Sequence, residues 1–221
     1  MKAHDRSTLL MKPQRRESRV KHFSLPLCAL LALLLSGCTT IDELKSTKQY
    51  TPKQQREGSV NVASRATGLN DNKVGNTTIL SLPVGRIKAQ GDTRANIMKS
   101  VGVALSAAGY NAEDASFNSE DAGYVYAHIE RIAFGNFLFS TWGTIIVQLR
   151  LETRDGELLW DKRIRTSVNA VNNYDRTAVF AMNRLVKEMT LSFVQEDFYS
   201  ATQRVKRHNT FLEENTPLSS N

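Results

Sequence analysis

The sequence predicts an α+β domain: a mostly antiparallel sheet of about four strands with two helices packed on one face. Two segments, one ending at Gly109 and one beginning after Asn173, repeat apolar residues at helical spacing. Three segments between them alternate apolar and polar residues, as strands do when one sheet face is buried. The order of strand, helix, three strands and helix is typical of a two-layer fold. It also allows the first strand to pair in parallel with a neighbour through a right-handed crossover.

The first 37 residues form a predicted export signal. They carry seven Lys or Arg and two acids, all before a thirteen-residue apolar run, Phe23–Leu35. A membrane-spanning helix needs about 20 apolar residues, whereas a basic segment followed by a shorter apolar core is typical of a secretory signal. The sequence leaves open whether translation starts at Met1 or at Met11.

The end of this run resembles the lipobox of bacterial lipoproteins. It reads Leu35-Ser36-Gly37-Cys38. The resemblance implies cleavage before Cys38 and acylation of Cys38 as the first residue of the mature chain. The small residues Ser36 and Gly37 suit a peptidase that binds an extended segment in shallow pockets. The alternative is a Cys that follows an ordinary signal by chance.

Removal of the signal changes both the charge and the cysteine content. The full chain has a formal charge of +7, but without the signal 22 basic and 20 acidic residues remain. The composition therefore does not indicate a nucleic-acid partner. Cys28 lies inside the signal and Cys38 would be acylated, so the mature chain keeps no thiol for a disulfide.

Two polar stretches flank the predicted domain at residues 77–200. Residues 38–76 comprise the lipidated Cys and a segment without an apolar period, for which we predict a flexible tether with a reach of about 35 Å. Residues 201–221 are predicted to form a polar C-terminal tail. This tail includes a short basic cluster, for which a solvated surface is favoured over an anionic contact: Arg204, Lys206, Arg207 and His208.

The domain begins with a strand and a helix. Residues 77–82 form a short apolar run that ends at Pro83, which predicts a strand. Asp92 is placed to cap the following helix and Gly109 to end it. Residues 111–123 are polar and acidic, which predicts a loop. The apolar positions of the helix are Ile97, Val101, Leu105 and Ala108.

Three strands and a second helix follow. Residues 124–134, 144–153 and 157–168 alternate, and Asp155-Gly156 predicts a tight turn between the last two. The second helix runs to about Glu196, and its apolar stripe has a period of 3.6. In the first strand Val125, Ala127 and Ile129 share one face, and in the second strand Ile145, Val147, Leu149 and Leu151 do so. The third strand continues the pattern with Leu158, Trp160, Lys162 and Ile164. The helical stripe consists of Ala178, Met182, Leu185, Val186, Met189 and Phe193.

The residues available for catalysis are few. The mature chain has two histidines. His128 and Glu130 share a strand face and could form a metal or acid–base pair, although a solvated strand face is favoured. Nucleophile-elbow, phosphate-loop and nucleotide-binding patterns are missing from the sequence, so we expect no enzymatic activity, metal or cofactor. One group of acids lacks the spacing of a calcium loop and is interpreted as a solvated loop: Glu113, Asp114, Glu120 and Asp121.

Residues 134–143, FGNFLFSTWG, are unusual for a connection between two strands. Such connections are normally polar and rich in turn residues, but this one holds five large apolar side chains. Either the strands continue and bury them, or they form an apolar tip that contacts a partner or a bilayer. The candidates for that contact are Phe137, Leu138, Phe139 and Trp142.

The segment from about Asn76 to Phe198 carries four family-like stretches, TTILSLPV, ALSAAGY, LRLETRDGELLWDKRI and EDF. In these it resembles the small periplasmic lipoprotein domains of the YajG type and of ABC-transport auxiliary lipoproteins. The stretches are signatures of a fold and not of a site. The resemblance implies a binding or structural component of the envelope and transfers no site residue.

These observations together predict a non-catalytic accessory lipoprotein. Thr39 follows the lipidated Cys38, and in enterobacteria-like sorting a residue other than Asp there implies transfer to the outer membrane. We expect the domain to face the periplasm and to bind a protein of an envelope assembly or lipid-transport system. The alternative is an activator or scaffold for cell-wall synthesis or a secretion machine.

Overall fold

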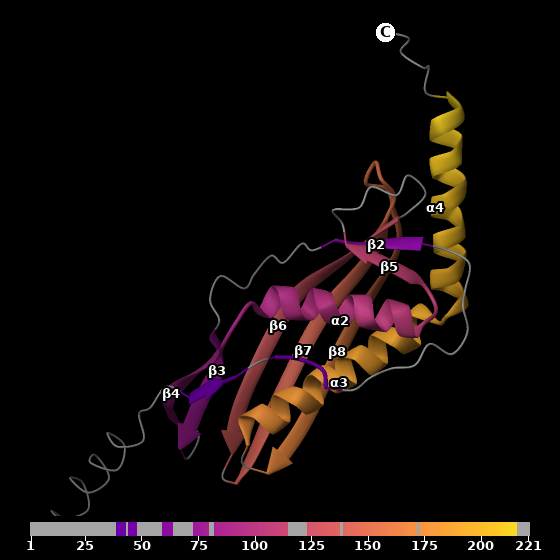
Figure 1. Cartoon of the computed structure of the whole chain (residues 1–221). Coiled ribbons are helices and arrows are strands. Elements are labelled where there is room, and N and C mark those ends of the chain that lie inside the picture. Colours follow the sequence, from indigo (N-terminus) through magenta and orange to yellow (C-terminus); the bar gives the residue numbers. More distant parts are fainter. Residues whose placement is uncertain are drawn as a thin grey trace, which may run out of the picture. The chain divides into compact units, whose positions relative to one another are not determined.

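The computed structural model describes residues 39–42, 44–47, 59–63, 73–79, 82–114, 123–137, 139–171 and 173–215. These residues form one eight-stranded sheet and three helices (Figure 1), which confirms the α+β class. The predicted signal, Cys38 and Leu138 lie outside the described residues.

Three long antiparallel strands form one side of the sheet. They are β6 (Gly123–Phe137), β7 (Ser140–Glu152) and β8 (Leu158–Val171). Their predicted alternation is confirmed for the apolar positions named in β6 and β7 and for Trp160 and Ile164 of β8, which are buried. Leu158, at the start of β8, is instead 49% exposed. The turn before β8 contains Gly156 at φ +92°, a conformation that glycine adopts without a steric penalty.

The other edge of β6 is shared by two short parallel strands. Strand β2 (Ser59–Ala63) pairs with the beginning of β6, and β3 (Lys73–Ile79) reaches its other end, where Gly75 lies opposite Phe134. The predicted parallel pairing of the first strand is therefore present. Three further strands extend the sheet: β1 (Thr39–Ile41) and β4 (Leu82–Ala89) beyond β3, and β5 (Asn111–Asp114) beyond β2.

The predicted number of strands was too low, and the sheet is mixed: β3–β4, β6–β7 and β7–β8 are antiparallel, and the remaining pairs are parallel. Pro83 does not end a strand but lies in β4, which forms a hairpin with β3. Proline is tolerated near the start of a strand, where one missing N–H disturbs the ladder least. The polar loop predicted at 111–123 begins with strand β5, and Gly123 already belongs to β6.

Helices α2 (Thr93–Ala107) and α3 (Tyr174–Phe193) cover one face of the sheet (Figure 1). Asp92 caps α2 as predicted, accepting from the N–H groups of Arg94 and Ala95, and Gly109 follows the helix at φ +92°. Asn173 caps α3 in the same way. Every predicted apolar position of the two helices is buried, so both stripes form the core under the sheet.

A third helix, α4 (Glu196–Asn215), occupies most of the segment predicted to be a polar tail. Phe198 is fully buried among the rings of Tyr110, Trp160 and Phe193. The indole N–H of Trp160 donates to the Asp197 carboxylate at 3.1 Å. These contacts hold the first turn of α4 on the domain. Within the predicted tail itself, Ala201 and Val205 are buried, so its described part is not a solvated tail.

The chain that directly follows Cys38 is part of the fold, not a tether. Strand β1 pairs in parallel with β4, and Ile41 and Leu44 are fully buried. The Asn183 side chain of α3 accepts from the Ser46 hydroxyl at 2.7 Å and from the Thr47 N–H at 3.0 Å. Two buried apolar side chains and these polar contacts order the segment where composition predicted flexibility.

Candidate interaction surfaces

The apolar connection between β6 and β7 continues both strands, and two aromatic–glycine pairs fix its register. Phe134 lies opposite Gly143, and Gly135 opposite Trp142. A Cβ on Gly143 would overlap the Phe134 ring, and one on Gly135 would lie 2.5 Å from the Trp142 ring. Because neighbouring residues of a strand point to opposite faces, Phe134 covers its glycine on the helix side and Trp142 covers its glycine on the outer side.

The structure divides this segment between core and solvent. Phe134 is buried, but Phe137 is 58% exposed, Phe139 79% and Trp142 37%. Val171, at the end of β8, is 77% exposed. We call the four exposed side chains of Phe137, Phe139, Trp142 and Val171 the apolar tip.

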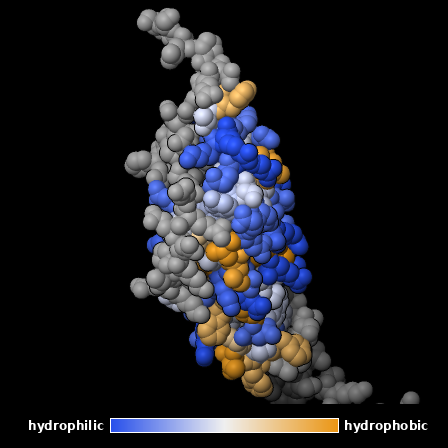
Figure 2. All heavy atoms as spheres, turned by 90° about the vertical axis from the view of Figure 1, so that its right-hand side faces the viewer, coloured by the Kyte–Doolittle hydropathy of each residue, from blue (hydrophilic) through white to orange (hydrophobic). Residues whose placement is uncertain are grey.

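Apolar side chains gather at the lower end of the face shown in Figure 2. In Figure 1 this is the end at which β6 turns into β7 and β8 stops. Strand pairing explains the grouping of the apolar tip. Phe137 lies opposite Ser140, which in turn lies opposite Val171, and Trp142 is two residues beyond Ser140 on the same face.

The side chain of Asn136, next to the apolar tip, hydrogen-bonds to residues of β3 and α3. Its amide oxygen accepts from the Thr78 N–H at 2.8 Å and from the Tyr174 hydroxyl at 2.9 Å, and its amide nitrogen donates to the Thr78 carbonyl at 3.0 Å. Partial burial raises the pKa of the Tyr174 hydroxyl, which therefore stays a donor. Asn136 thus links β6, β3 and α3, a role that its place among apolar residues did not reveal.

A buried hydroxyl pair supports the same end of the sheet. The hydroxyl oxygens of Thr141 and Thr177 lie 2.5 Å apart and share a hydrogen bond. The Thr177 hydroxyl also donates to the Asn173 carbonyl. Both residues are buried. The tip therefore projects from a rigid base, in which β7 is joined to the beginning of α3.

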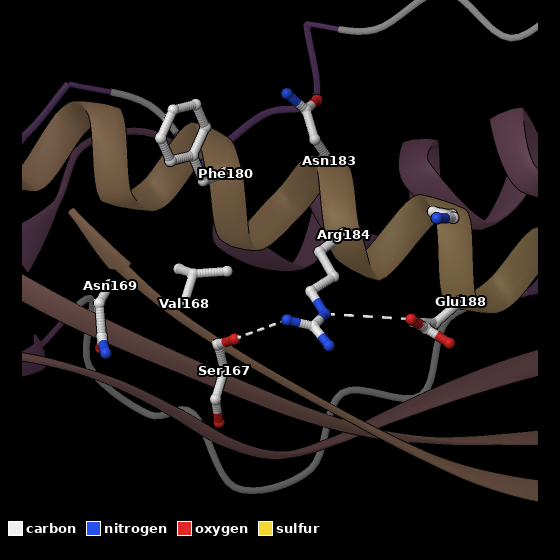
Figure 3. A pocket seen from close by; sticks show the side chains of 8 residues that line it. Ser167, Val168, Asn169, Phe180, Asn183, Arg184 and Glu188 are labelled. Carbon is white, nitrogen blue, oxygen red and sulfur yellow. Dashed lines mark hydrogen bonds and ion pairs between the residues drawn. The ribbon is translucent and has the colours of Figure 1, made fainter.

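A second surface lies between α3 and the edge strand β8 (Figure 3). It is a groove of about 750 Å³. The Arg184 guanidinium reaches from α3 across the groove, donates to the Ser167 carbonyl at 3.2 Å and lies 3.9 Å from the Glu188 carboxylate. The groove is lined by Ser167, Val168, Asn169, Phe180, Asn183, Arg184, Lys187 and Glu188.

Among the described residues, β8 pairs only with β7, so its other edge is open. The Ser167 carbonyl meets Arg184 on that open side, whereas the Ala170 carbonyl accepts from Thr141 of β7. Since backbone groups alternate between the two sides of a strand, the N–H and C=O of Arg165, Ser167 and Asn169 face the groove. This edge offers hydrogen bonds to another extended segment.

The sequence left open a metal or acid–base pair at His128 and Glu130, both of which lie in β6. The Glu130 carboxylate accepts two hydrogen bonds from Arg163, at 2.8 and 3.0 Å, on the exposed sheet face. This hydrogen bonding, together with the charge of Arg163, holds the pKa of Glu130 below its ordinary value. Glu130 is thus an ion-pair partner that stays ionised at neutral pH.

The remaining predicted groups are dispersed. Glu113 and Asp114 lie in β5, while Glu120 and Asp121 fall outside the described residues. His208 of α4 lies 3.1 Å from Asp155, whose pKa is lowered by a hydrogen bond from Thr153 and by His208. In the described part of the chain, His, Cys, Asp and Glu side chains form no cluster of three or more that could hold a metal. None of the described helices is long and apolar enough to cross a membrane.

No protein-family model and no curated protein matches the chain. Solved structures do match: a Xanthomonas campestris protein of the DUF330 family has a TM-score of 0.44 at 12% identity, covering 81% of this chain and 100% of that one. A minor lipoprotein from Acinetobacter baumannii has a TM-score of 0.28 at 12% identity, covering 67% and 91%. The lipoprotein GNA1162 from Neisseria meningitidis has a TM-score of 0.34 at 12% identity, covering 60% and 99%. At these scores and identities we transfer no residue role, and the YajG-type resemblance stays a prediction.

Proposed function

We propose that this chain is a lipid-anchored, non-catalytic accessory lipoprotein of the bacterial envelope. Acylated Cys38 holds it on the periplasmic face of the outer membrane, and it binds a protein of an envelope assembly or lipid-transport system. The lipobox-like sequence at residues 35–38 supports the anchor. The open edge of β8 beside the α3 groove is the observation that carries the binding role.

The partner segment expected at this edge is an extended strand. It would pair with the backbone of Arg165, Ser167 and Asn169, and displace Arg184 from the Ser167 carbonyl. Main-chain hydrogen bonds would supply affinity, and the groove beside Val168 and Phe180 would select alternate side chains.

The anchor is tested by substitution of Cys38. Wild-type protein should incorporate labelled palmitate and fractionate with the outer membrane, and Cys38→Ser should do neither. If wild-type protein takes up no label, the lipoprotein assignment is wrong.

The binding surface is tested by a photo-crosslinking residue placed at Asn169 in living cells. A discrete adduct should form there, and mass spectrometry should identify an envelope protein. The control position is Arg150, which is also exposed but lies on β7, a strand paired on both sides.

Backbone pairing is tested by two substitutions at Asn169. Asn169→Pro removes the N–H that faces the groove and should abolish the adduct from a crosslinker at Lys187, whereas Asn169→Ala should keep it. Equal adduct yields in both variants would contradict strand pairing. The identity of the partner decides between a transport or assembly role and the alternative, an activator or scaffold for cell-wall synthesis or a secretion machine.

A further inference from the structure

The lipid-bearing end of the mature chain and the apolar tip lie at the same end of the sheet. Strand β3 runs parallel to β6 with Gly75 opposite Phe134, so Ile79, four residues on, is level with the tip. Leu82, the first residue of β4, pairs with Ile79. Strand β4 therefore starts beside the tip and runs away from it.

Strand β1 runs parallel to β4, with Thr39 opposite Ile87. Thr39 therefore lies five residues from the start of β4, or about 16 Å along the strand from the level of the tip. The residue before Thr39 in the sequence is Cys38. Consecutive Cα atoms of a chain are about 3.8 Å apart, so the acylated residue directly adjoins β1.

The order of strands gives the sideways separation. From β1 the path passes β4 and β3 to β6, which pairs with β7. Four strand spacings amount to about 19 Å. A membrane that receives the lipid of Cys38 can therefore also reach the tip if the strands are tilted, because no tether separates the lipid from β1.

We propose that Phe137, Phe139, Trp142 and Val171 insert into the interface of the membrane that holds the lipid of Cys38. This rests on the proposed lipidation and names a lipid surface as the partner of the tip. Aromatic side chains favour the boundary between headgroups and acyl chains. The tip offers three aromatic rings and one aliphatic side chain at the end of the sheet.

Basic side chains lie behind the tip on the same outer face. Arg131 and Arg165 flank Ile146 across three strands, and all three point away from the helices. Arg86 and Lys88 lie on β4, next to the anchored strand β1, and point away from the buried side that holds Ile87. These four exposed cations suit the anionic headgroups of a membrane, which attract Lys and Arg side chains near the surface.

The direct link between the lipid and the fold favours a membrane over a protein at the tip. One acylated residue already places the domain at the bilayer, so insertion of the tip is effectively intramolecular.

The mature chain allows a site-specific test, because acylation of Cys38 leaves no other thiol. A single Cys is introduced as Phe139→Cys or Val171→Cys and labelled with the environment-sensitive dye NBD. The full lipidated protein is reconstituted into vesicles of phosphatidylethanolamine and phosphatidylglycerol. The matched control is Leu158→Cys, an exposed apolar position at the opposite end of β8.

We expect NBD at residues 139 and 171 to shift to shorter wavelength and to lose at least half of its emission to lipid-borne nitroxide quenchers. NBD at residue 158 should instead be quenched by aqueous iodide. Quenching by iodide at all three positions would overturn the inference. Protection of residue 139 from both quenchers would also overturn it, because it indicates contact with protein.

The outcome is separable from that of the proposed function. If Cys38 takes up palmitate and the partner crosslinks at Asn169, yet residue 139 stays in water, only the membrane contact of the tip is wrong. If Cys38 takes up no palmitate, the proposed anchor fails before the vesicle experiment is made.

Discussion

At the residue scale, two glycines determine how closely β6 and β7 pack their aromatic rings. A Cβ at Gly143 would overlap the ring of Phe134, which is 1% exposed and held in the core. We expect Gly143→Ala to lower the free energy of unfolding by about 1–3 kcal/mol, as overpacking does. Gly135→Ala should cost less, since the half-exposed Trp142 ring can move outward. Urea denaturation of the variants measures both.

Gly102 provides the control for this comparison. It lies inside helix α2, and a Cβ there would meet nothing within 4 Å. Gly102→Ala should stabilise the protein by up to about 1 kcal/mol, because alanine loses less backbone entropy in a helix. Destabilisation by both Gly102→Ala and Gly143→Ala to the same extent would contradict the packing argument.

The ion pair of Glu130 and Arg163 makes stability depend on pH. The pKa of Glu130 is lowered in the folded state by the hydrogen bonds from Arg163. Its contribution is therefore present above the unfolded pKa of about 4.3 and is lost as the pH falls through the lower folded value. The stability difference between wild type and Glu130→Gln should be largest at neutral pH and shrink toward pH 3.

A double-mutant cycle isolates this effect. In an Arg163→Gln background, Glu130→Gln should leave the pH profile of stability nearly unchanged, since the interaction is already absent. Thermal unfolding at several pH values and low salt is the measurement. A difference that persists at pH 3 in the wild-type background would exclude the ion pair as its cause.

Sequence reasoning at this scale was accurate where a local rule applies. Asp92, Asn173, Gly109 and Gly156 follow capping and turn chemistry that depends on nearby backbone groups. Asn136 follows no such rule, because its partners lie 58 and 38 residues away. The exposure of the tip was likewise open, since the pairing of aromatic residues with glycines becomes visible only when the register of β6 and β7 is known.

At the element scale, α4 differs most from expectation. Its exposed face is strongly polar, and only a few apolar positions mark its buried face. Phe198 packs on Trp160 with ring centroids 4.8 Å apart and on Phe193 at 4.7 Å. The residues against which this face packs lie in β8 and α3. The composition of the segment does not reveal these contacts, and it is therefore that of a solvated tail.

Truncation of Phe198 tests whether α4 belongs to the domain. Phe198→Ala should lower the free energy of unfolding by about 3–5 kcal/mol, as loss of a buried Phe does. Phe211→Ala, in the same helix at 62% exposure, should change it by less than about 0.5 kcal/mol. Similar values for the two variants would mean that α4 does not pack as described.

At the scale of the whole molecule, the segment after Cys38 joins the anchor to the fold. Its polar composition predicted a tether, since two buried residues give no periodic signal. The strand β1 and Leu44 gain their order from long-range contacts: Ile41 lies in the sheet, and the Asp42 N–H donates to Asp175 of α3 at 3.0 Å. Contacts between such distant residues cannot be inferred from local sequence.

Leu44 allows this arrangement to be tested. Leu44→Ala should destabilise the domain by about 2–5 kcal/mol, because the side chain is fully buried. The control is Thr40→Ala, at an exposed position of β1, which should change stability by less than about 0.5 kcal/mol. A tolerated Leu44→Ala would show that the segment contributes little to the fold.

The last prediction concerns the length of chain between the lipidated residue Cys38 and strand β1. If the lipid holds the apolar tip at the membrane, a longer connection should weaken that contact. Insertion of one Thr and about 20 Gly/Ser residues between Cys38 and Thr39 keeps a Thr after the lipidated residue. It also adds a flexible reach of about 25 Å. Acylation should persist, but the effective concentration of the tip at the bilayer should fall.

The same dye reports this change. NBD at residue 139 should lose part of its quenching by lipid-borne nitroxides and gain quenching by iodide, whereas NBD at residue 158 should not change. An inserted segment of equal length between Asn215 and the C-terminus, far along the chain from the tip, serves as the control. If the linker after Cys38 leaves residue 139 as deep in the membrane as before, insertion does not depend on the direct link between the lipid and β1. The apolar tip alone would then account for the membrane contact.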